Sequence, residues 1–180
     1  MWVLTEAKMR LFTALCFDEE TKNALFAAGK AAEISSEGNF SPKENLHLTL
    51  VFIGETERTE EIISAVSEIE FPSFEFKISG TGIFEKGIFW AGTEENENLR
   101  NLYKEVFEKI RGLGFEPEER EFVPHITLAR KFRPGKSFSA EETEKLLPEK
   151  AVFANRISLM KSERIEGVLR YTEIYSKKLL

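Results

Sequence analysis

The chain has 180 residues, of which 42% are hydrophobic and 31% charged, and its formal net charge is −6 at pH 7. This composition supports a sizeable core beneath a polar surface, which excludes disordered and collagen-like proteins. The longest apolar runs are far shorter than the roughly 20 residues that span a bilayer, so no membrane segment is expected. The acidic balance also excludes a wide basic surface for gripping long nucleic-acid duplexes.

Two features of the sequence bear on the cellular location of the protein and on its N-terminal segment. The single cysteine, Cys16, lies in an apolar run and has no internal disulfide partner, and no basic and apolar leader opens the sequence. We therefore expect the protein to be located in the reducing cytoplasm. A monomer is a separate expectation that does not follow from these features. Residues 1–8 precede the first clear pattern and are expected to form an extension, with Met9 as an alternative start.

Strand and helix periodicities alternate in the first half of the chain. They predict, in order, a strand at 10–17, a helix reaching about residue 34, a strand at 46–53, a helix at 59–69 and a strand at 74–78. Asp18 is well placed to cap the first helix, and residues 36–42 break it. Gly54 ends the second strand.

The second half repeats this order of elements. It predicts, in order, a strand at 88–92, a helix at 96–113, a strand at 122–130, a short helix that ends before Pro148, and strands at 151–161 and 171–179. A tight turn at 85–87 leads into the first of these strands, and Ser139 with Glu142 forms a capping box for the short helix.

This duplication predicts an α+β fold. We expect residues 1–180 to form a single bilobal domain with lobe-level repeats at about 10–80 and 88–162 and a C-terminal strand at 171–179. The two pseudo-symmetric lobes of mainly antiparallel sheet would carry outer helices around a central cleft.

The two histidines of the chain stand in the same local frame. The two motifs are His47-Leu48-Thr49-Leu50 and His125-Ile126-Thr127-Leu128. A lone histidine on a strand is more often structural than catalytic. The chance that both carry threonine two positions on is only on the order of a few in a thousand, and each motif lies in the equivalent strand of its repeat. The repetition therefore favours a paired function.

The spacing indicates what this pair can do. Side chains alternate along a strand, so His47 and Thr49 share one face, as do His125 and Thr127. If the lobes are related by an approximate two-fold axis, the two pairs flank one substrate atom. One imidazole can then accept a proton while the other donates one, and the hydroxyls can bind non-bridging phosphate oxygens. This arrangement favours phosphoryl transfer at a ribose hydroxyl and requires neither a metal nor another cofactor.

The motifs and their flanks resemble those of a known family. Residues 10–15, 47–55 and 122–130 are similar to the signatures of the 2H phosphoesterase superfamily, in particular its RNA 2′,3′-cyclic phosphodiesterases, also called 2′-5′ RNA ligases. The resemblance implies a bilobal α+β fold and the opening of a terminal 2′,3′-cyclic phosphate to a 2′-phosphate without metal or ATP. Reversible 2′-5′ ligation would be the reverse reaction.

The resemblance also implies roles for individual residues. His47 would be the proton donor to the departing 3′ oxygen, His125 the base that activates water, and Thr49 and Thr127 the phosphate contacts. The sequence leaves open which face the ribose presents, and in ligation the two histidines exchange roles.

Other residues near the motifs are also candidates for the site. Arg130 is a candidate phosphate ligand, but strict alternation puts it on the opposite face from His125, so it needs a bulge to reach the site; a salt bridge is the alternative. Pro124 suggests that the second motif lies on an edge strand or at the start of a strand. Phe52 has the parity of the core leucines and is expected to be buried. Aromatic candidates for stacking on a base are Phe40, Phe52, Phe84, Phe89, Trp90 and Phe132.

The expected partners are RNA ends or small nucleotides that carry a 2′,3′-cyclic phosphate. Two alternatives stay open. One is a 2H phosphodiesterase that acts on 2′-5′ oligonucleotides or another cyclic nucleotide. The other is a non-catalytic RNA- or nucleotide-binding module, in which the motifs only hold phosphate.

Overall fold

The computed structural model describes residues 7–119 and 121–180, so most of the expected extension at 1–8 lies outside the described residues. Within that part of the chain, eight antiparallel strands form one large sheet in the order β10-β9-β1-β3-β7-β6-β5, with β2 also paired to β7. The strands are β1 (Met9–Cys16), β2 (Ser36–Phe40), β3 (His47–Thr56), β5 (Ile78–Phe84), β6 (Ile88–Thr93), β7 (His125–Pro134), β9 (Arg156–Ile165) and β10 (Val168–Lys178). A separate pair joins β4 (Phe74–Phe76) to β8 (Val152–Ala154).

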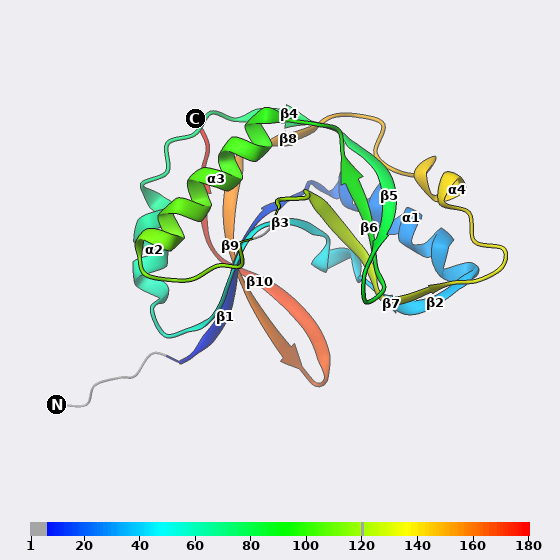
Figure 1. Cartoon of the computed structure of the whole chain (residues 1–180), viewed down its shortest axis with the longest axis horizontal. Helices are drawn as coiled ribbons and strands as arrows, with labels where there is room; N and C mark the ends of the chain where they lie inside the picture. The colour runs from blue at the N-terminus through cyan, green and yellow to red at the C-terminus, as the bar shows by residue number, and fades with distance from the viewer. Residues whose placement is uncertain (1–6, 120) are drawn as a thin grey trace.

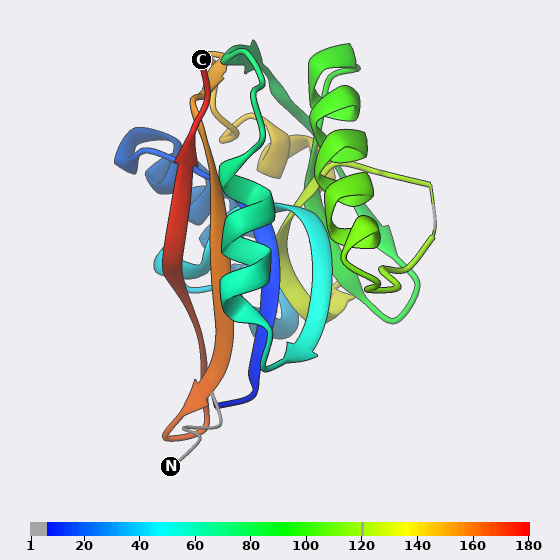
Figure 2. The same ribbon diagram turned by 90° about the vertical axis from the view of Figure 1, so that its left-hand side faces the viewer.

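The helices lie outside this sheet (Figures 1 and 2). They are α1 (Glu19–Ile34), α2 (Thr59–Ser67), α3 (Glu97–Gly112), the short α4 (Ala140–Glu144) and the 3-10 turn η1 (Lys43–Asn45). Helix α1 contacts β2 and β7, whereas α3 contacts β3 and α2. Each long helix therefore covers a histidine-bearing strand from the other half of the chain, and the fold is the expected mainly antiparallel α+β arrangement.

Local chemistry explains where these elements begin. The Asp18 carboxylate accepts a hydrogen bond from Thr21 N at 2.8 Å and caps α1, as the sequence predicts. Asn96 caps α3 in the same way, accepting from Leu99 N at 3.0 Å. Within the turn between β5 and β6, Lys86 and Gly87 have φ angles of 66° and 71°, which is the backbone of a tight hairpin turn.

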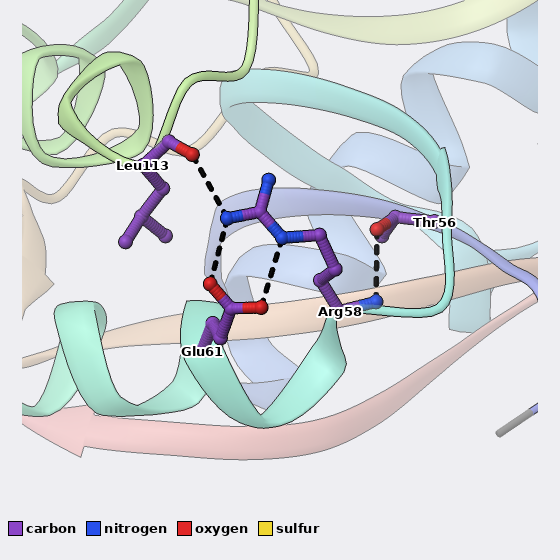
Figure 3. Close-up of polar contacts among 4 residues, drawn as sticks. All are labelled: Thr56, Arg58, Glu61 and Leu113. Atoms are coloured by element: carbon purple, nitrogen blue, oxygen red, sulfur yellow. Dashed lines mark hydrogen bonds and ion pairs between the residues drawn. The ribbon is translucent and has the colours of Figure 1, made fainter.

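Arg58 joins α2 to the end of α3 (Figure 3). Its backbone N–H donates to Thr56 Oγ1 at 2.9 Å, and its guanidinium binds both carboxylate oxygens of Glu61 at 2.9 and 2.6 Å. The same guanidinium donates to the Leu113 carbonyl at 2.9 Å and lies over the ring of Phe115. These contacts hold the two helices together on the outside of the sheet.

The expected and observed elements differ at several places. The strand predicted at 151–161 is divided into β8 and β9, which belong to different sheets, the strand predicted at 74–78 is divided into β4 and β5, and β3 continues past Gly54 to Thr56.

The sequence predicts a break at 36–42, but Ser36–Phe40 forms the strand β2. This polar segment is a strand because it pairs with the second half of β7, residues 129–134. Strand β7 begins at His125 rather than at residue 122, as Pro124 suggests. Strand β10 begins at Val168, so that β9 and β10 form a long hairpin that extends beyond the neighbouring strands (Figure 1). No helix among residues 7–119 and 121–180 is long and apolar enough to cross a membrane.

Candidate active site

Strands β3 and β7 bring the two sequence motifs together. Leu48 pairs with Ile126, and both side chains are fully buried in the core. The residues on either side of this pair therefore project from the opposite side of the sheet. They are His47 and Thr49 on β3, and His125 and Thr127 on β7, all four partly buried. We call this side of the sheet the histidine face.

The register fixes how near the two histidines lie. Antiparallel pairing of Leu48 with Ile126 makes His47 and His125 diagonal neighbours, whose Cα atoms lie about 7–8 Å apart and whose Cβ atoms lie somewhat closer. Two imidazoles at this spacing can reach opposite sides of one phosphate. Arg130 and His125 both interact electrostatically with the His47 ring, which places all three side chains in the same neighbourhood.

The His47 ring is oriented by two hydrogen bonds. Its Nδ1 lies 2.6 Å from the Asn45 carbonyl oxygen, and its Nε2 lies 2.9 Å from Thr49 Oγ1. A carbonyl oxygen can only accept, so Nδ1 carries the hydrogen. In the neutral ring Nε2 is then the acceptor, and the Thr49 hydroxyl donates to it.

His125 is held by an equivalent bond. Its Nδ1 lies 2.7 Å from the carbonyl oxygen of Val123, the residue two positions earlier, as Asn45 is for His47. Nδ1 of His125 therefore also donates to backbone, and Nε2 is the nitrogen that exchanges a proton. The two motifs share this tautomer as well as their sequence.

The environment of His47 favours its neutral form. Burial lowers the pKa of His47 to about 4, helped by the electrostatic interactions with Arg130 and His125, although the hydrogen bond to the Asn45 carbonyl acts in the opposite direction. His47 is therefore neutral at pH 7 in this structure.

Aromatic rings flank both histidines. The His47 ring lies 4.9 Å from the ring of Phe12 and 5.0 Å from the ring of Tyr171, between centroids. The His125 ring meets Phe84 edge to face at 4.9 Å, and Phe84 in turn lies 5.0 Å from Trp90. These contacts limit the rotation of the two imidazole rings and border the site on two sides.

A β-bulge brings Arg130 to the histidine face. In the pairing with β6, Trp90 lies opposite Thr127 and Phe89 opposite Ala129, so Leu128 is an extra residue in β7. Leu128 and Ala129 are both buried, and the alternation resumes with Arg130 exposed on the same side as Thr127. The bulge that Arg130 requires is therefore present.

The expectation that Phe52 is buried is wrong. Thr13 pairs with Val51 and Ala14 with Thr49, so Leu50 is an extra residue in β3 and reverses the faces of the residues after it. Phe52 lies opposite Phe12, whose ring contacts that of His47, and its side chain is 46% exposed. Of the other aromatic candidates, Phe89 and Phe132 belong to the core.

Two residues that lie beside His47 are not part of either His-x-Thr motif. Asn45 is buried; its amide donates to the Leu169 carbonyl at 2.8 Å and its side-chain oxygen accepts from Tyr171 N at 3.3 Å. Asn45 thereby ties the β9–β10 hairpin to the carbonyl that holds His47. Cys16 lies opposite His47 on β1, and burial raises the pKa of its thiol, which makes it a weak nucleophile.

Two grooves of the molecule lie away from the histidines. One, of about 400 Å³, runs between α2 and α3, and another of about 400 Å³ lies between α1 and the segment from Phe40 to Leu46. Neither is lined by a histidine. Among residues 7–119 and 121–180, no three His, Cys, Asp or Glu side chains are grouped to hold a metal ion.

Fold and site together define an α+β protein in which two strand-borne His-x-Thr motifs meet on one sheet face. The family model of the 2′-5′ RNA ligase superfamily matches residues 24–166. The chain belongs to this superfamily.

Individual relatives agree with this assignment. The RNA 2′,3′-cyclic phosphodiesterase of Thermotoga maritima is 37% identical over 140 residues, which cover 71% of this chain and 73% of that protein. The protein of the same name from Methanocaldococcus jannaschii is 34% identical over 145 residues, covering 76% and 80%. The crystal structure of E. coli LigT in apo form has a TM-score of 0.82 at 22% identity, covering 96% of this chain and 98% of that one, which supports the fold.

Proposed function

We propose that this protein is an RNA 2′,3′-cyclic phosphodiesterase, an enzyme that hydrolyses a terminal 2′,3′-cyclic phosphate to a 2′-phosphate by two-histidine acid and base catalysis. The observation that carries the proposal is the pair of imidazoles on one sheet face, each with Nδ1 bound to a backbone carbonyl. Relatives that align with more than two thirds of this chain bear this enzyme name, which supports the proposed reaction.

The chemistry balances with these groups alone. A base histidine accepts a proton from water, the water oxygen forms a bond to phosphorus, and the bond from phosphorus to O3′ breaks. The second histidine gives its proton to O3′, leaving a 2′-phosphate. Thr49, Thr127 and Arg130 would bind the non-bridging oxygens as charge accumulates on them.

We propose His47 as the proton donor and His125 as the base. His47 is neutral in the empty site, so this assignment requires it to take up a proton when the phosphate binds. A nearby anion raises a histidine pKa, and the bound phosphodiester supplies one. In 2′-5′ ligation, the reverse reaction, the two histidines exchange roles.

The setting of the enzyme is part of the proposal. We infer that it acts in the cytoplasm as a monomeric, single bilobal domain on RNA ends, without a metal or cofactor. The two histidines can carry out both proton transfers of the reaction, and the two threonines can bind the phosphate oxygens.

A single incubation tests the reaction. The protein is mixed with a 2′,3′-cyclic nucleotide and with an RNA that ends in a 2′,3′-cyclic phosphate, and the products are analysed for 2′- or 3′-phosphate. We expect 2′-phosphate. Formation of 3′-phosphate would contradict the proposed bond cleavage, and binding without product would leave a phosphate-binding module as the function.

A further inference from the structure

Asn45 joins two parts of the large sheet that are not neighbours within it. Its side-chain amide donates to the Leu169 carbonyl at 2.8 Å, and its side-chain oxygen accepts from Tyr171 N at 3.3 Å. Both partners belong to β10, an edge strand that β9 and β1 separate from β3. The Asn45 side chain therefore satisfies this edge as a neighbouring strand would, because it binds a carbonyl and an N–H two residues apart.

This contact brings the Tyr171 ring onto His47. The Tyr171 ring meets the imidazole edge to face at 5.0 Å and the ring of Phe12 at 5.1 Å, between centroids. The backbone carbonyl of Asn45 accepts the hydrogen bond from His47 Nδ1 at 2.6 Å. Asn45 thus acts on His47 twice, through its own carbonyl and through the strand that its side chain holds.

The second motif provides a comparison within the chain. Val123 stands two residues before His125, as Asn45 does before His47, and its carbonyl makes the same bond to Nδ1 at 2.7 Å. The Val123 side chain has no hydrogen-bonding group and is 42% exposed, whereas Asn45 is 8% exposed. The carbonyl contact is therefore common to both motifs, and the contribution of a side-chain amide is specific to His47.

We propose that Asn45 is a positioning residue for His47. Its amide holds β10 so that Tyr171 covers the imidazole, and this cover together with the Asn45 carbonyl keeps the ring in the tautomer that presents Nε2 to the substrate. Without the amide, the Leu169 carbonyl and the Tyr171 N–H lose these partners, which frees this part of β10 to move away from the ring. This role rests on the proposed function, in which His47 exchanges a proton with the substrate.

The titration of His47 reports whether its cover is intact. Burial is the leading cause of its pKa of about 4. Several charged or titratable groups also face this ring from the neighbouring strands: Arg130 and His125 on β7, Cys16 on β1, and Tyr171 on β10. Asn45→Ala changes none of these groups, so a rise in the pKa of His47 in this variant measures the loss of burial.

Asn96 provides a matched control. Its side chain makes the same pair of bonds as that of Asn45, accepting from Leu99 N at 3.0 Å and donating to the Glu75 carbonyl at 2.9 Å, but it lies at the start of α3. Asn96→Ala therefore removes an equivalent pair of hydrogen bonds away from His47. Thermal unfolding of each variant sets the temperature below which it is folded and can be compared with the wild type.

Nitrogen-15 NMR and steady-state kinetics measure the effect. The chain holds two histidines, so the imidazole spectrum contains two sets of signals, and His125→Gln assigns them. Asn45→Ala is expected to raise the pKa of His47 from about 4 toward 6.5 and to move its nitrogen shifts from one tautomer toward a mixture of both. On a 2′,3′-cyclic nucleotide, kcat should fall about tenfold with KM within about twofold, because the phosphate ligands remain. Asn96→Ala should change none of these quantities.

A second variant and the remaining outcomes decide the proposal. Asn45→Ser retains one hydrogen-bonding group, so it serves where the alanine variant does not fold, and it should change the same quantities in the same direction but less. An unchanged His47 titration in a folded Asn45 variant, or an equal change in Asn96→Ala, would overturn the proposal. If the wild type opens no cyclic nucleotide, the proposed function fails, whereas the NMR titration needs no substrate and still decides whether Asn45 positions His47.

Discussion

Phe52 and Arg130 occupy the same place on their two strands. Each lies five residues after its histidine and comes after a bulge, at Leu50 in β3 and at Leu128 in β7, that turns it onto the histidine face. One position holds an aromatic ring and the other a cation. The site is therefore symmetric in its histidines and threonines but not in the residues that would orient an RNA end.

Removing either histidine should abolish most of the turnover. His47→Ala and His125→Ala are expected to lower kcat by 10² or more, because each loses an acid or base, while the fold persists. Steady-state kinetics on a cyclic nucleotide and thermal unfolding measure the two effects. Wild-type rates in both variants would rule out the two-histidine mechanism.

The stability of the protein should depend on pH through His47. Its folded-state pKa is about 4, below the ordinary value of 6.5, so between these values the unfolded chain binds more protons than the folded one. Stability is therefore fully present above pH 6.5 and falls, by up to about 3 kcal/mol, as the pH drops toward 4. Urea unfolding at several pH values measures this, and His47→Gln should flatten the slope in this window. An equal slope in the variant would assign it to other groups.

Binding of an anionic nucleotide should draw a proton into the site. At pH 6 His47 is mostly neutral in the empty protein, and a bound phosphate raises its pKa, so calorimetry in buffers of different ionisation enthalpy should report net proton uptake. His47→Gln is expected to lose this uptake. Binding by the wild type without proton exchange would contradict a donor role for His47.

Arg130 should act on both substrate binding and the pKa of His47. Arg130→Gln is expected to raise KM about tenfold by removing a charged phosphate ligand, and to raise the pKa of His47 because a nearby positive charge is lost. The pH dependence of kcat/KM and of stability should shift together. Arg133→Gln, at an exposed arginine of the same strand, is the control and should change neither.

Catalysis should depend on the hydroxyl groups of Thr49 and Thr127 more than on the packing of these side chains. Thr49→Val and Thr127→Val keep the shape of the side chain but lose the donor, and each is expected to lower kcat about 10²-fold. Thr49→Ser restores the hydroxyl and should recover most of the activity. A Thr49→Val enzyme with the kcat of the wild type would show that the 2.9 Å contact to His47 Nε2 has no catalytic part.

Activity should survive a chelator. Because the proposed steps use only side chains of the protein, excess EDTA is expected to leave the rate of cyclic phosphate opening unchanged. Loss of activity that a divalent ion restores would instead require a metal in the mechanism.

Local sequence patterns predict the main helices and the strands that carry the motifs. Asp18 and Ser139 mark helix starts because a cap depends on residues only three positions apart. Pro124 marks the start of β7 because proline lacks a backbone donor. Strand β2, by contrast, has no apolar pattern of its own and exists because it pairs with β7, a contact between segments far apart in the chain.

The sequence by itself determined the pairing of His47 with Thr49 and of His125 with Thr127, since alternation along a strand is a local property. Tertiary structure decided which residues join them. Bulges set by the pairing of β3 with β1 and of β7 with β6 turn Phe52 and Arg130 onto the histidine face, against simple alternation. The low pKa of His47 likewise depends on burial and on charges from β7, because desolvation and electrostatics act between residues that only the folded sheet brings together.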